Sequence, residues 1–264
     1  MPRILITGTS SGFGLAIAKL FIEQGWEVIA TMRNPSNESL PISDNVRVLP
    51  LDVTQEASIA AAVAQAGPVD ALVNNAGVGM LNVLEGADIA RARELFDTNV
   101  LGTMAMTRAV MPGMRQRRSG VIINISSSVT LRSLPALSIY SASKSAVNSF
   151  TESFALEAAE FGVRVKLILP GSSPDTAFGR NAVARMGMNV PEAYQDFVEA
   201  YLRSLRIATD KTQAGDVAQA VWRAVTDEIA PMRIPAGADA ETWFREANFP
   251  PFDSLGAAIP SLDR

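Results

Sequence analysis

The sequence contains neither cysteine nor histidine. Without cysteine the chain has no disulfide, no thiol nucleophile and no thiolate metal ligand, and without histidine it has no imidazole ligand. Hydrolases built on Ser-His-Asp or Cys-His pairs are therefore excluded. Any catalysis must rely on other acids and bases, and we expect a site without a metal ion.

Long apolar runs are also missing. The run before Gly8 has four or five apolar residues, far fewer than a signal-peptide core or the ~20 residues of a membrane-spanning helix. The net charge of −4 and the pI of about 5.1 have the wrong sign for binding nucleic acid. We therefore expect a cytoplasmic protein that binds neither a membrane nor nucleic acid, and the lack of cysteine agrees with a reducing compartment.

The chain does contain enough apolar residues for a large core. Of its 264 residues, 48% are hydrophobic and 19% are charged, and the mean hydropathy is +0.16. A disordered chain would be less apolar. No linker long enough to separate domains is visible, so we expect a single domain over residues 1–264.

Short apolar runs alternate with helical patterns as far as residue 170. This alternation is typical of βαβ units and predicts an α/β fold: a Rossmann-type, doubly wound, mostly parallel sheet with helices on both faces. The expected strands are 4–6, 28–31, 46–51, 71–73, 121–125 and 163–169, and the expected helices are 15–21, 57–66, 88–117 and 141–160.

The rhythm breaks after Pro170. Residues 171–205 have the composition of a mobile lid over a substrate. A helical pattern returns from Thr212 through Trp222, residues 232–235 are a candidate last strand, and the Pro-rich tail 249–264 is expected to be irregular.

A Gly-rich loop lies between the first expected strand and the first expected helix. Glycines let the backbone approach a pyrophosphate, and a helix N-terminus presents free N–H groups to it. The spacing differs from G-x-G-x-x-G, the loop lacks the lysine of a P-loop, and an ordinary tight turn remains the alternative. The expected dinucleotide contacts are Gly8, Ser10, Ser11, Gly12, Phe13 and Gly14.

Three further motifs follow in order. Asn74-Asn75-Ala76-Gly77 comes after the fourth strand, Ser127 comes after the fifth, and Tyr140 lies thirteen residues beyond Ser127 and four before Lys144. With Thr7 to Gly14, this set resembles the short-chain dehydrogenase/reductase family, and in particular its NADP-using hydroxysteroid and retinol dehydrogenases. The resemblance covers about residues 3 to 240. It implies that Asn75, Ala76 and Gly77 contact the cofactor, and that Phe13 replaces a usual Ile.

The chemistry of Tyr140 can be argued from the residues. Hydride transfer between a nicotinamide and a carbonyl or alcohol needs a group that gives or takes the hydroxyl proton. A phenol has a pKa near 10, and we expect Lys144, one helical turn away, to favour the phenolate together with an oxidised nicotinamide. Tyr140 is thus the expected acid/base, with Lys144 as its tuner and as a ribose ligand; the alternative is an amphipathic helix start with a solvated lysine. This pair removes the need for a metal.

The resemblance supplies two further catalytic residues. It implies that Ser127 hydrogen-bonds the substrate oxygen, although Ser126 and Ser128 are chemically equivalent neighbours and only the family's thirteen-residue spacing selects Ser127. It also implies that Asn99 supports a proton relay to Lys144. For Asn99 the alternative is a helix-interior amide that bonds a local carbonyl.

The residues after the second and third strands address the choice of cofactor. No acid follows the second strand, whereas Arg33 is there to accept a 2′-phosphate, so we expect NADP(H) rather than NAD(H), with Ser11 adding a hydroxyl. The alternative is an exposed loop arginine. Asp52, followed by Val53, matches the family aspartate that bonds the adenine, but could equally be a helix N-cap.

The segment after the sixth strand departs from the family pattern. Family members have Pro-Gly, three residues and a Thr that contacts the nicotinamide. Here Pro170 and Gly171 are followed by one more residue than usual before Thr176, and Pro174 lacks an N–H. Pro170, Gly171 and Thr176 are the expected cofactor contacts of this segment.

The same sequence leaves alternative functions open. A dinucleotide-binding sensor or scaffold without turnover is the main alternative, and an epimerase or dehydratase is the alternative among enzymes. The expected substrate-lining residues are Leu137, Ser138, 78–80 and 178–188, which are largely apolar and favour an apolar small-molecule carbonyl or alcohol. Family members commonly pair through the two long helices, here 90–117 and 141–160, so a homodimer or homotetramer is expected.

Overall fold

The computed structural model describes residues 1–264 except 37–38, 42, 174–189, 208–210 and 249–264. Within the described residues seven strands form one sheet in the order β3-β2-β1-β4-β5-β6-β7, and every neighbouring pair is parallel. The predicted doubly wound α/β sheet is confirmed. The strands are β1 (Arg3–Thr7), β2 (Glu27–Met32), β3 (Val46–Pro50), β4 (Ala71–Asn74), β5 (Gly120–Ile125), β6 (Val163–Pro170) and β7 (Arg233–Ala236).

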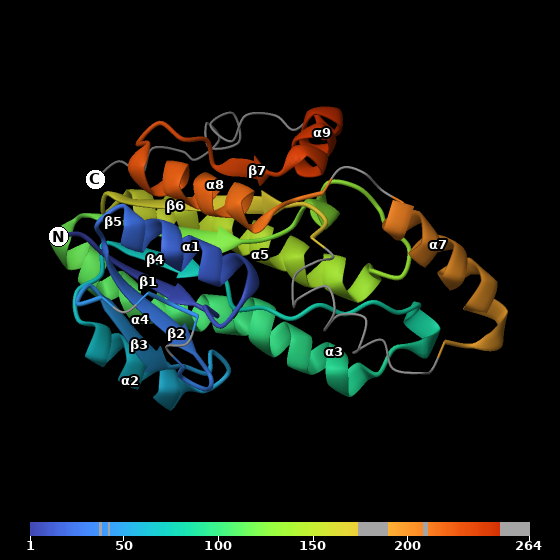
Figure 1. Cartoon of the computed structure of the whole chain (residues 1–264), viewed down its shortest axis with the longest axis horizontal. Coiled ribbons are helices and arrows are strands. Elements are labelled where there is room, and N and C mark those ends of the chain that lie inside the picture. Colours follow the sequence, from blue (N-terminus) through green and yellow to red (C-terminus); the bar gives the residue numbers. More distant parts are fainter. Residues whose placement is uncertain (37–38, 42, 174–189, 208–210, 249–264) are drawn as a thin grey trace, which may run out of the picture.

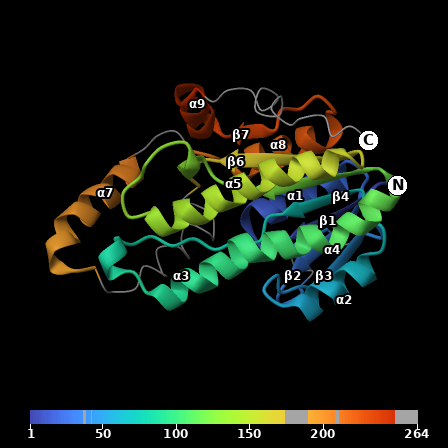
Figure 2. The same cartoon turned by 180° about the vertical axis from the view of Figure 1, so that it is seen from behind.

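Helices cover both faces of this sheet (Figures 1 and 2). None of the helices in the described part is both long and apolar enough to cross a membrane. The α-helices are α1 (Gly12–Glu23), α2 (Glu56–Ala66), α3 (Ile89–Phe96), α4 (Gly102–Arg117), α5 (Ser138–Ala159), α7 (Gln195–Ile207), α8 (Ala214–Thr226) and α9 (Ala238–Ala247).

Alternate residues of the strands supply the two hydrophobic layers. In β1, Ile4 and Ile6 pack with α1 and α8, whereas Leu5 packs on the opposite face with α2, α4 and α5. Strands that are buried on both faces read as continuous apolar runs, which is why these strands show no polar alternation in the sequence. Figure 1 shows α1 and α8 in front of the sheet, and Figure 2 shows α4 and α5 on the other side.

The expected helix 88–117 is a composite. Asp88 caps α3 by accepting the Ala90 N–H, and one turn of π-helix, η2 (Asp97–Leu101), joins α3 to α4. Such a turn inserts one extra residue into the helix and often marks a functional position. Here it contains Asn99.

The region after β6 differs more from the sequence expectation. Of the proposed lid, the described residues include α7, which lies beyond the ends of α3 and α5 in both views (Figures 1 and 2). Residues 232–235 overlap β7 as predicted, but α9, directly after β7, was not expected. The tail 249–264 and the segment 174–189 lie outside the described residues.

Candidate active site

A cleft of about 1580 Å³ lies at the carboxyl ends of the parallel strands. Strand order reverses between β1 and β4, and such a switch point leaves a crevice in which open α/β sheets bind ligands. Residues one or two positions after six strands line the cleft: Gly8 after β1, Arg33 after β2, Asp52 after β3, Asn75 after β4, Ser126 and Ser127 after β5, and Gly171 after β6.

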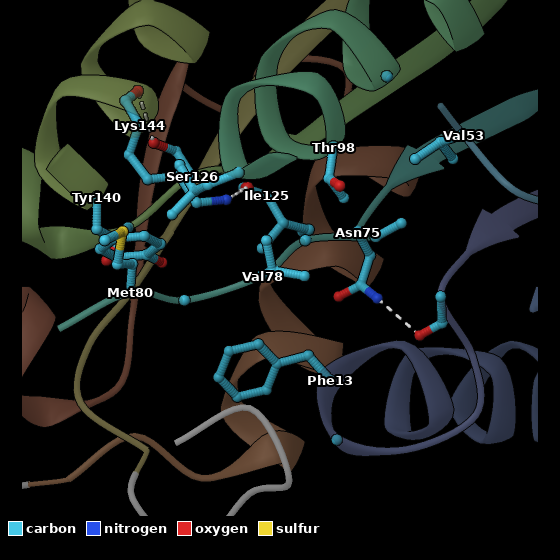
Figure 3. A pocket seen from close by; sticks show the side chains of 18 of the residues that line it. Phe13, Val53, Asn75, Val78, Met80, Thr98, Ile125, Ser126, Tyr140 and Lys144 are labelled. Atoms are coloured by element: carbon cyan, nitrogen blue, oxygen red, sulfur yellow. Dashed lines mark hydrogen bonds between the residues drawn. The ribbon is translucent and has the colours of Figure 1, made fainter. Parts of the chain in front are cut away.

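The Gly-rich loop and the Asn75–Gly77 loop are held together at the centre of the cleft. Asn75 donates its side-chain N–H groups to the carbonyls of Thr7 (2.9 Å) and Gly8 (3.0 Å), as Figure 3 shows in part. The Thr7 hydroxyl accepts the N–H groups of Asn75 and Ala76, each at 2.9 Å. Gly8 has φ +72°, and a Cβ there would lie 2.9 Å from the Ala76 Cα. The glycine is therefore required both by its conformation and by the close approach.

This loop has the shape that a pyrophosphate needs. Gly12 has φ +58° and begins α1, whose N-terminus faces the cleft. Ser11 precedes the helix as its N-cap, but its side chain makes no capping hydrogen bond, so the loop presents backbone N–H groups and hydroxyls to an anion. The lining residues Ser10, Ser11, Gly12 and Phe13 are brought together as predicted, and Gly14 packs behind them against Gly8 and Asn75.

Arg33 and Asp52 lie together at the outer end of the cleft. Both line it, and the Arg33 charge contributes to lowering the pKa of the Asp52 carboxyl, although the hydrogen bonds from Thr54 contribute more. Thr54 donates its N–H (2.9 Å) and its hydroxyl (2.7 Å) to this carboxylate. Val53, beside them, also lines the cleft.

Asp52 is not a helix N-cap. The helix α2 begins at Glu56, and its N-cap is Gln55. The Asp52 carboxylate instead closes a tight turn with Thr54, two residues on, and Arg33 is near enough to act on its charge. The N-cap alternative is wrong, and the cofactor-contact prediction stays a prediction.

Ser127 and Tyr140 meet across the cleft. Tyr140 is the third residue of α5, and Ser127 lies two residues after β5. A side-chain hydrogen bond joins them. Ser126 instead bonds the Asn148 side chain (2.5 Å) and the Lys144 carbonyl (3.4 Å). The serine that the spacing selected is therefore the one that reaches the phenol.

The phenol of Tyr140 is almost completely buried. Burial raises the pKa of Tyr140 above its ordinary value, and the Ser127 hydrogen bond offsets this only in part. In the protein without a cofactor the pKa of Tyr140 is thus not lowered, although the sequence predicted a lowering by Lys144. Without a bound cation the residue is a neutral phenol, which is a proton donor.

Lys144 lies one turn after Tyr140 and is also buried. Its Nζ donates to the Ile125 carbonyl (2.9 Å; Figure 3) and lies 5.9 Å from the centre of the Tyr140 ring. Burial lowers the pKa of Lys144 to about 8. The ammonium therefore remains mostly charged at neutral pH and lines the cleft. It has three N–H donors, and a ribose hydroxyl is a fitting acceptor for one of them.

Asn99 is fixed by backbone 21 residues away. Its Oδ1 accepts the Val78 N–H (2.8 Å), and its Nδ2 donates to the Val78 carbonyl (2.9 Å) and the Ser143 hydroxyl (3.3 Å). The alternative of an amide that satisfies a local carbonyl is thus wrong. A Cβ on Gly77 would lie 3.3 Å from Asn99 Oδ1 and 3.8 Å from Lys144 Nζ, so the two side chains flank the same loop.

The inner end of the cleft is largely apolar. Met80 packs with Tyr140 and Leu95, and Leu137 packs beside them. Val78–Met80 and Leu137 line the cleft as predicted, Ser138 is not among the lining residues, and residues 178–188 lie outside the described residues. The lining residues Leu81, Leu134 and Trp243 belong to no motif and were not predicted, whereas Tyr201 and Leu202 fall within the predicted lid 171–205.

Pro170 and Gly171 line the cleft beside the Ser127–Tyr140 pair, at the end of β6. Thr176 lies outside the described residues. Thr7 has a role that the motif alone did not indicate: its hydroxyl accepts two backbone N–H groups at the centre of the cleft.

The family assignment rests on sequence and structure together. A family model described as short chain dehydrogenase matches residues 2–186. The chain belongs to the short-chain dehydrogenase/reductase family. It is similar to a 3-ketodihydrosphingosine reductase of Bacteroides thetaiotaomicron (37% identity, 92% of this chain and 91% of the relative) and to human retinol dehydrogenase 8 (34%, 88% and 80%).

Solved structures share the fold over most of the chain. A short-chain dehydrogenase from Streptomyces avermitilis superposes with a TM-score of 0.79 at 32% identity, covering 97% of this chain and 95% of that one. One from Burkholderia cenocepacia in complex with NADP gives 0.76 at 27% (97% and 96%). A 3-ketoacyl-(acyl-carrier-protein) reductase from Brucella melitensis complexed with NADH gives 0.71 at 25% (89% and 96%). The family of this chain is one of oxidoreductases whose structures hold either dinucleotide.

Proposed function

We propose that this protein is an NADP(H)-dependent oxidoreductase that transfers a hydride between the nicotinamide and an apolar carbonyl or alcohol. The observation that carries the proposal is the convergence of Ser127, Tyr140 and Lys144 on one cleft with the Gly-rich loop. A buried phenol with a raised pKa beside a charged lysine has no evident structural purpose, whereas perturbed titrating groups in a cleft are typical of catalysis.

Arg33 supports NADP(H) over NAD(H). It is exposed at the end of β2, lines the cleft, and is not accompanied by a carboxylate in residues 31–34. A guanidinium forms charge-assisted hydrogen bonds with a phosphate, whereas a carboxylate at this position would repel it. The relatives leave the choice open, because one structure carries NADP and another NADH.

In the proposed reaction, four residues have separate roles in proton transfer to and from the substrate oxygen. The nicotinamide supplies or accepts the hydride. In reduction, the Ser127 hydroxyl holds the substrate oxygen, and the Tyr140 Oη gives its proton to that oxygen as negative charge develops on it. The Lys144 ammonium, 5.9 Å from the ring, stabilises the phenolate left behind and binds a ribose hydroxyl. Asn99 holds the Val78 backbone beside Lys144 and is placed to support reprotonation through water.

The apolar inner cleft supports a bulky, uncharged substrate. Met80, Leu95 and Leu137 pack around Tyr140, and Trp243 and Leu202 line the same space. Two relatives are named for long apolar substrates, a ketosphingoid and a retinol. We propose a ketone or alcohol with a long apolar chain.

The non-catalytic alternative, a dinucleotide-binding sensor or scaffold, is disfavoured. Such a protein has no need for Ser127 and Tyr140 to meet, and yet they are hydrogen-bonded in the cleft. The homodimer or homotetramer stays a prediction; Leu101 and Leu156, exposed on the two long helical segments, are consistent with pairing there. Cytoplasmic localisation stays a prediction as well.

The test measures binding and turnover on the purified protein. NADPH and NADH are titrated by tryptophan quenching, and absorbance at the nicotinamide band is followed with a panel of apolar, sugar and anionic carbonyls. We expect tighter binding of NADPH and turnover of long-chain ketones. Binding without turnover on any carbonyl would favour the sensor, and tighter NADH binding would overturn the cofactor assignment.

A further inference from the structure

One buried carboxylate belongs to a residue that has no role in the proposed reaction. Asp239, in the first turn of α9, is 6% exposed. Its Oδ2 accepts the Ser172 N–H at 2.6 Å, and its Oδ1 lies 2.8 Å from the Thr212 hydroxyl. Burial of a charge is costly unless hydrogen bonds compensate it, so these two contacts are what permits an aspartate here.

Thr212 completes the arrangement. Its N–H donates to the Ser172 carbonyl (2.8 Å), and its hydroxyl accepts the Gly171 N–H (2.9 Å). The hydroxyl has one proton and two oxygens within reach, Asp239 Oδ1 at 2.8 Å and the Ala236 carbonyl at 2.9 Å, and the carboxylate is the stronger acceptor. We call Gly171, Ser172, Thr212 and Asp239 the β6 clamp.

Gly171 is required by this contact. A Cβ on Gly171 would overlap the Asp239 carboxylate. The glycine after Pro170 therefore does more than turn the chain: its missing side chain is the space that the carboxylate occupies. Three stretches far apart in the sequence thus meet at one point behind the end of β6.

The position of the β6 clamp ties it to the site. Strand β6 ends at Pro170 and helix α8 begins at Ala214. The clamp joins Ser172, just after the strand, to Thr212, just before the helix. Gly171, Ser172 and Lys211 line the cleft. The cleft has Arg33 and Asp52 at the β2–β3 end, whereas β6 neighbours β5, from which Ser127 projects toward Tyr140. The clamp therefore stands at the reacting end.

We propose that Asp239 and Thr212 are positioning residues that fix the Pro170–Ser172 backbone against the nicotinamide half of the bound dinucleotide. This inference rests on the proposed function, because it needs the dinucleotide to lie along the cleft. Neither residue touches the reacting atoms. They act through the N–H groups of Gly171 and Ser172, which they hold from behind.

A role in folding alone predicts a different pattern of losses. If the clamp only stabilised the fold, its loss would affect all ligands equally or none. A positioning role predicts that a ligand with a nicotinamide is affected and one without it is not. The adenosine fragment 2′,5′-ADP carries the 2′-phosphate but has no nicotinamide, so it probes the Arg33 end alone.

The experiment uses three clamp variants and one control. Thr212→Val removes the hydroxyl at equal size, Asp239→Asn removes the charge, and Thr212→Ser keeps the hydroxyl. Thr151→Val is the matched control: it removes an equally buried threonine hydroxyl, which accepts from Asn124 at 2.8 Å in the core. Dissociation constants for NADPH and 2′,5′-ADP are measured by calorimetry, and folding is checked by circular dichroism.

We expect Thr212→Val and Asp239→Asn to weaken NADPH about tenfold while 2′,5′-ADP changes less than about twofold. Thr212→Ser and Thr151→Val should leave both constants within about twofold. Equal losses for both ligands, or no loss in Thr212→Val, overturn the positioning role. Should Asp239→Asn fail to fold, Thr212→Val decides alone. A wild-type protein that binds neither ligand overturns the proposed function and this inference together, whereas wild-type binding with unaltered variants overturns only the inference.

Discussion

The centre of the cleft and its β6–β7 end are built differently. At the centre, between β1 and β4, the Gly-rich loop is held by Thr7 and Asn75, and each partner belongs to a motif that is visible in the sequence. At the β6–β7 end, the backbone is held by Thr212 and Asp239, which belong to no motif. Motifs therefore identify the groups that face a ligand, but not the groups that hold a ligand-facing backbone from behind.

The largest effect is expected at the phenol of Tyr140, because reduction of a carbonyl needs a proton donor. Tyr140→Phe keeps the ring and its packing with Met80 but removes the proton, so carbonyl reduction should fall by ~10²–10⁴ while NADPH binding persists. Single-turnover rates and quenching titrations measure the two quantities. A comparable kcat in the variant would mean that another residue donates the proton.

The Gly-rich loop comes next. Gly12 has φ +58° and lines the cleft, so Gly12→Val both strains the loop and fills the space over it. Several charge-assisted N–H contacts would be lost together, which predicts at least a ~100-fold weaker affinity for both NADPH and NADH. Circular dichroism should show an intact fold. Unchanged tryptophan quenching by NADPH in a folded variant would show that the loop is an ordinary tight turn that does not bind the dinucleotide.

Arg33 separates the two cofactors. A charge-assisted contact with the 2′-phosphate is worth roughly 1.5–3 kcal/mol, so Arg33→Ala should weaken NADPH ~10–100-fold and leave NADH nearly unchanged. Parallel titrations with both dinucleotides give the ratio. Equal losses of affinity for NADPH and NADH would show that Arg33 does not bind the 2′-phosphate and is only an exposed loop arginine.

The smallest effect concerns the buried lysine and the pH. Burial lowers the pKa of Lys144 to about 8, whereas an unfolded lysine titrates near 10.4. Below pH 8 both states are protonated and the lysine's contribution to the free energy of unfolding is constant. Between pH 8 and 10 the unfolded state binds more protons, so the wild type should gain stability relative to Lys144→Met, by up to ~1.4 kcal/mol per pH unit.

Urea denaturation of both proteins without dinucleotide, at pH 7, 8, 9 and 9.5, measures this difference. Tyr140 is common to both proteins, and its raised pKa matters only above its ordinary value near 10, outside the pH range used. Parallel curves of stability against pH would show that Lys144 has an ordinary pKa in the folded protein.

Much of the fold was predictable because local patterns specify it. Strands buried on both faces need uninterrupted apolar residues, and 121–125 and 163–169 agree with β5 and β6 to within one residue at each end. The length of the helical stretch 88–117 was predictable from its period, but the π-helical turn η2 within it was not. Asn99 in this turn bonds Val78, 21 residues away, and no local pattern indicates that contact. Helix α9 was not predicted, although five of its ten residues are apolar.

The sequence by itself determined the parallel α/β sheet, the Gly-rich loop at its switch point, and Tyr140 and Lys144 as the proposed catalytic pair, because each depends on residues close in the chain or on a fixed spacing. Only the tertiary structure decided that Ser127 rather than Ser126 reaches the phenol, that burial keeps Tyr140 protonated, and that Asp239 meets Gly171. Burial and contacts across 67 residues arise when separate elements pack, and no local pattern encodes them.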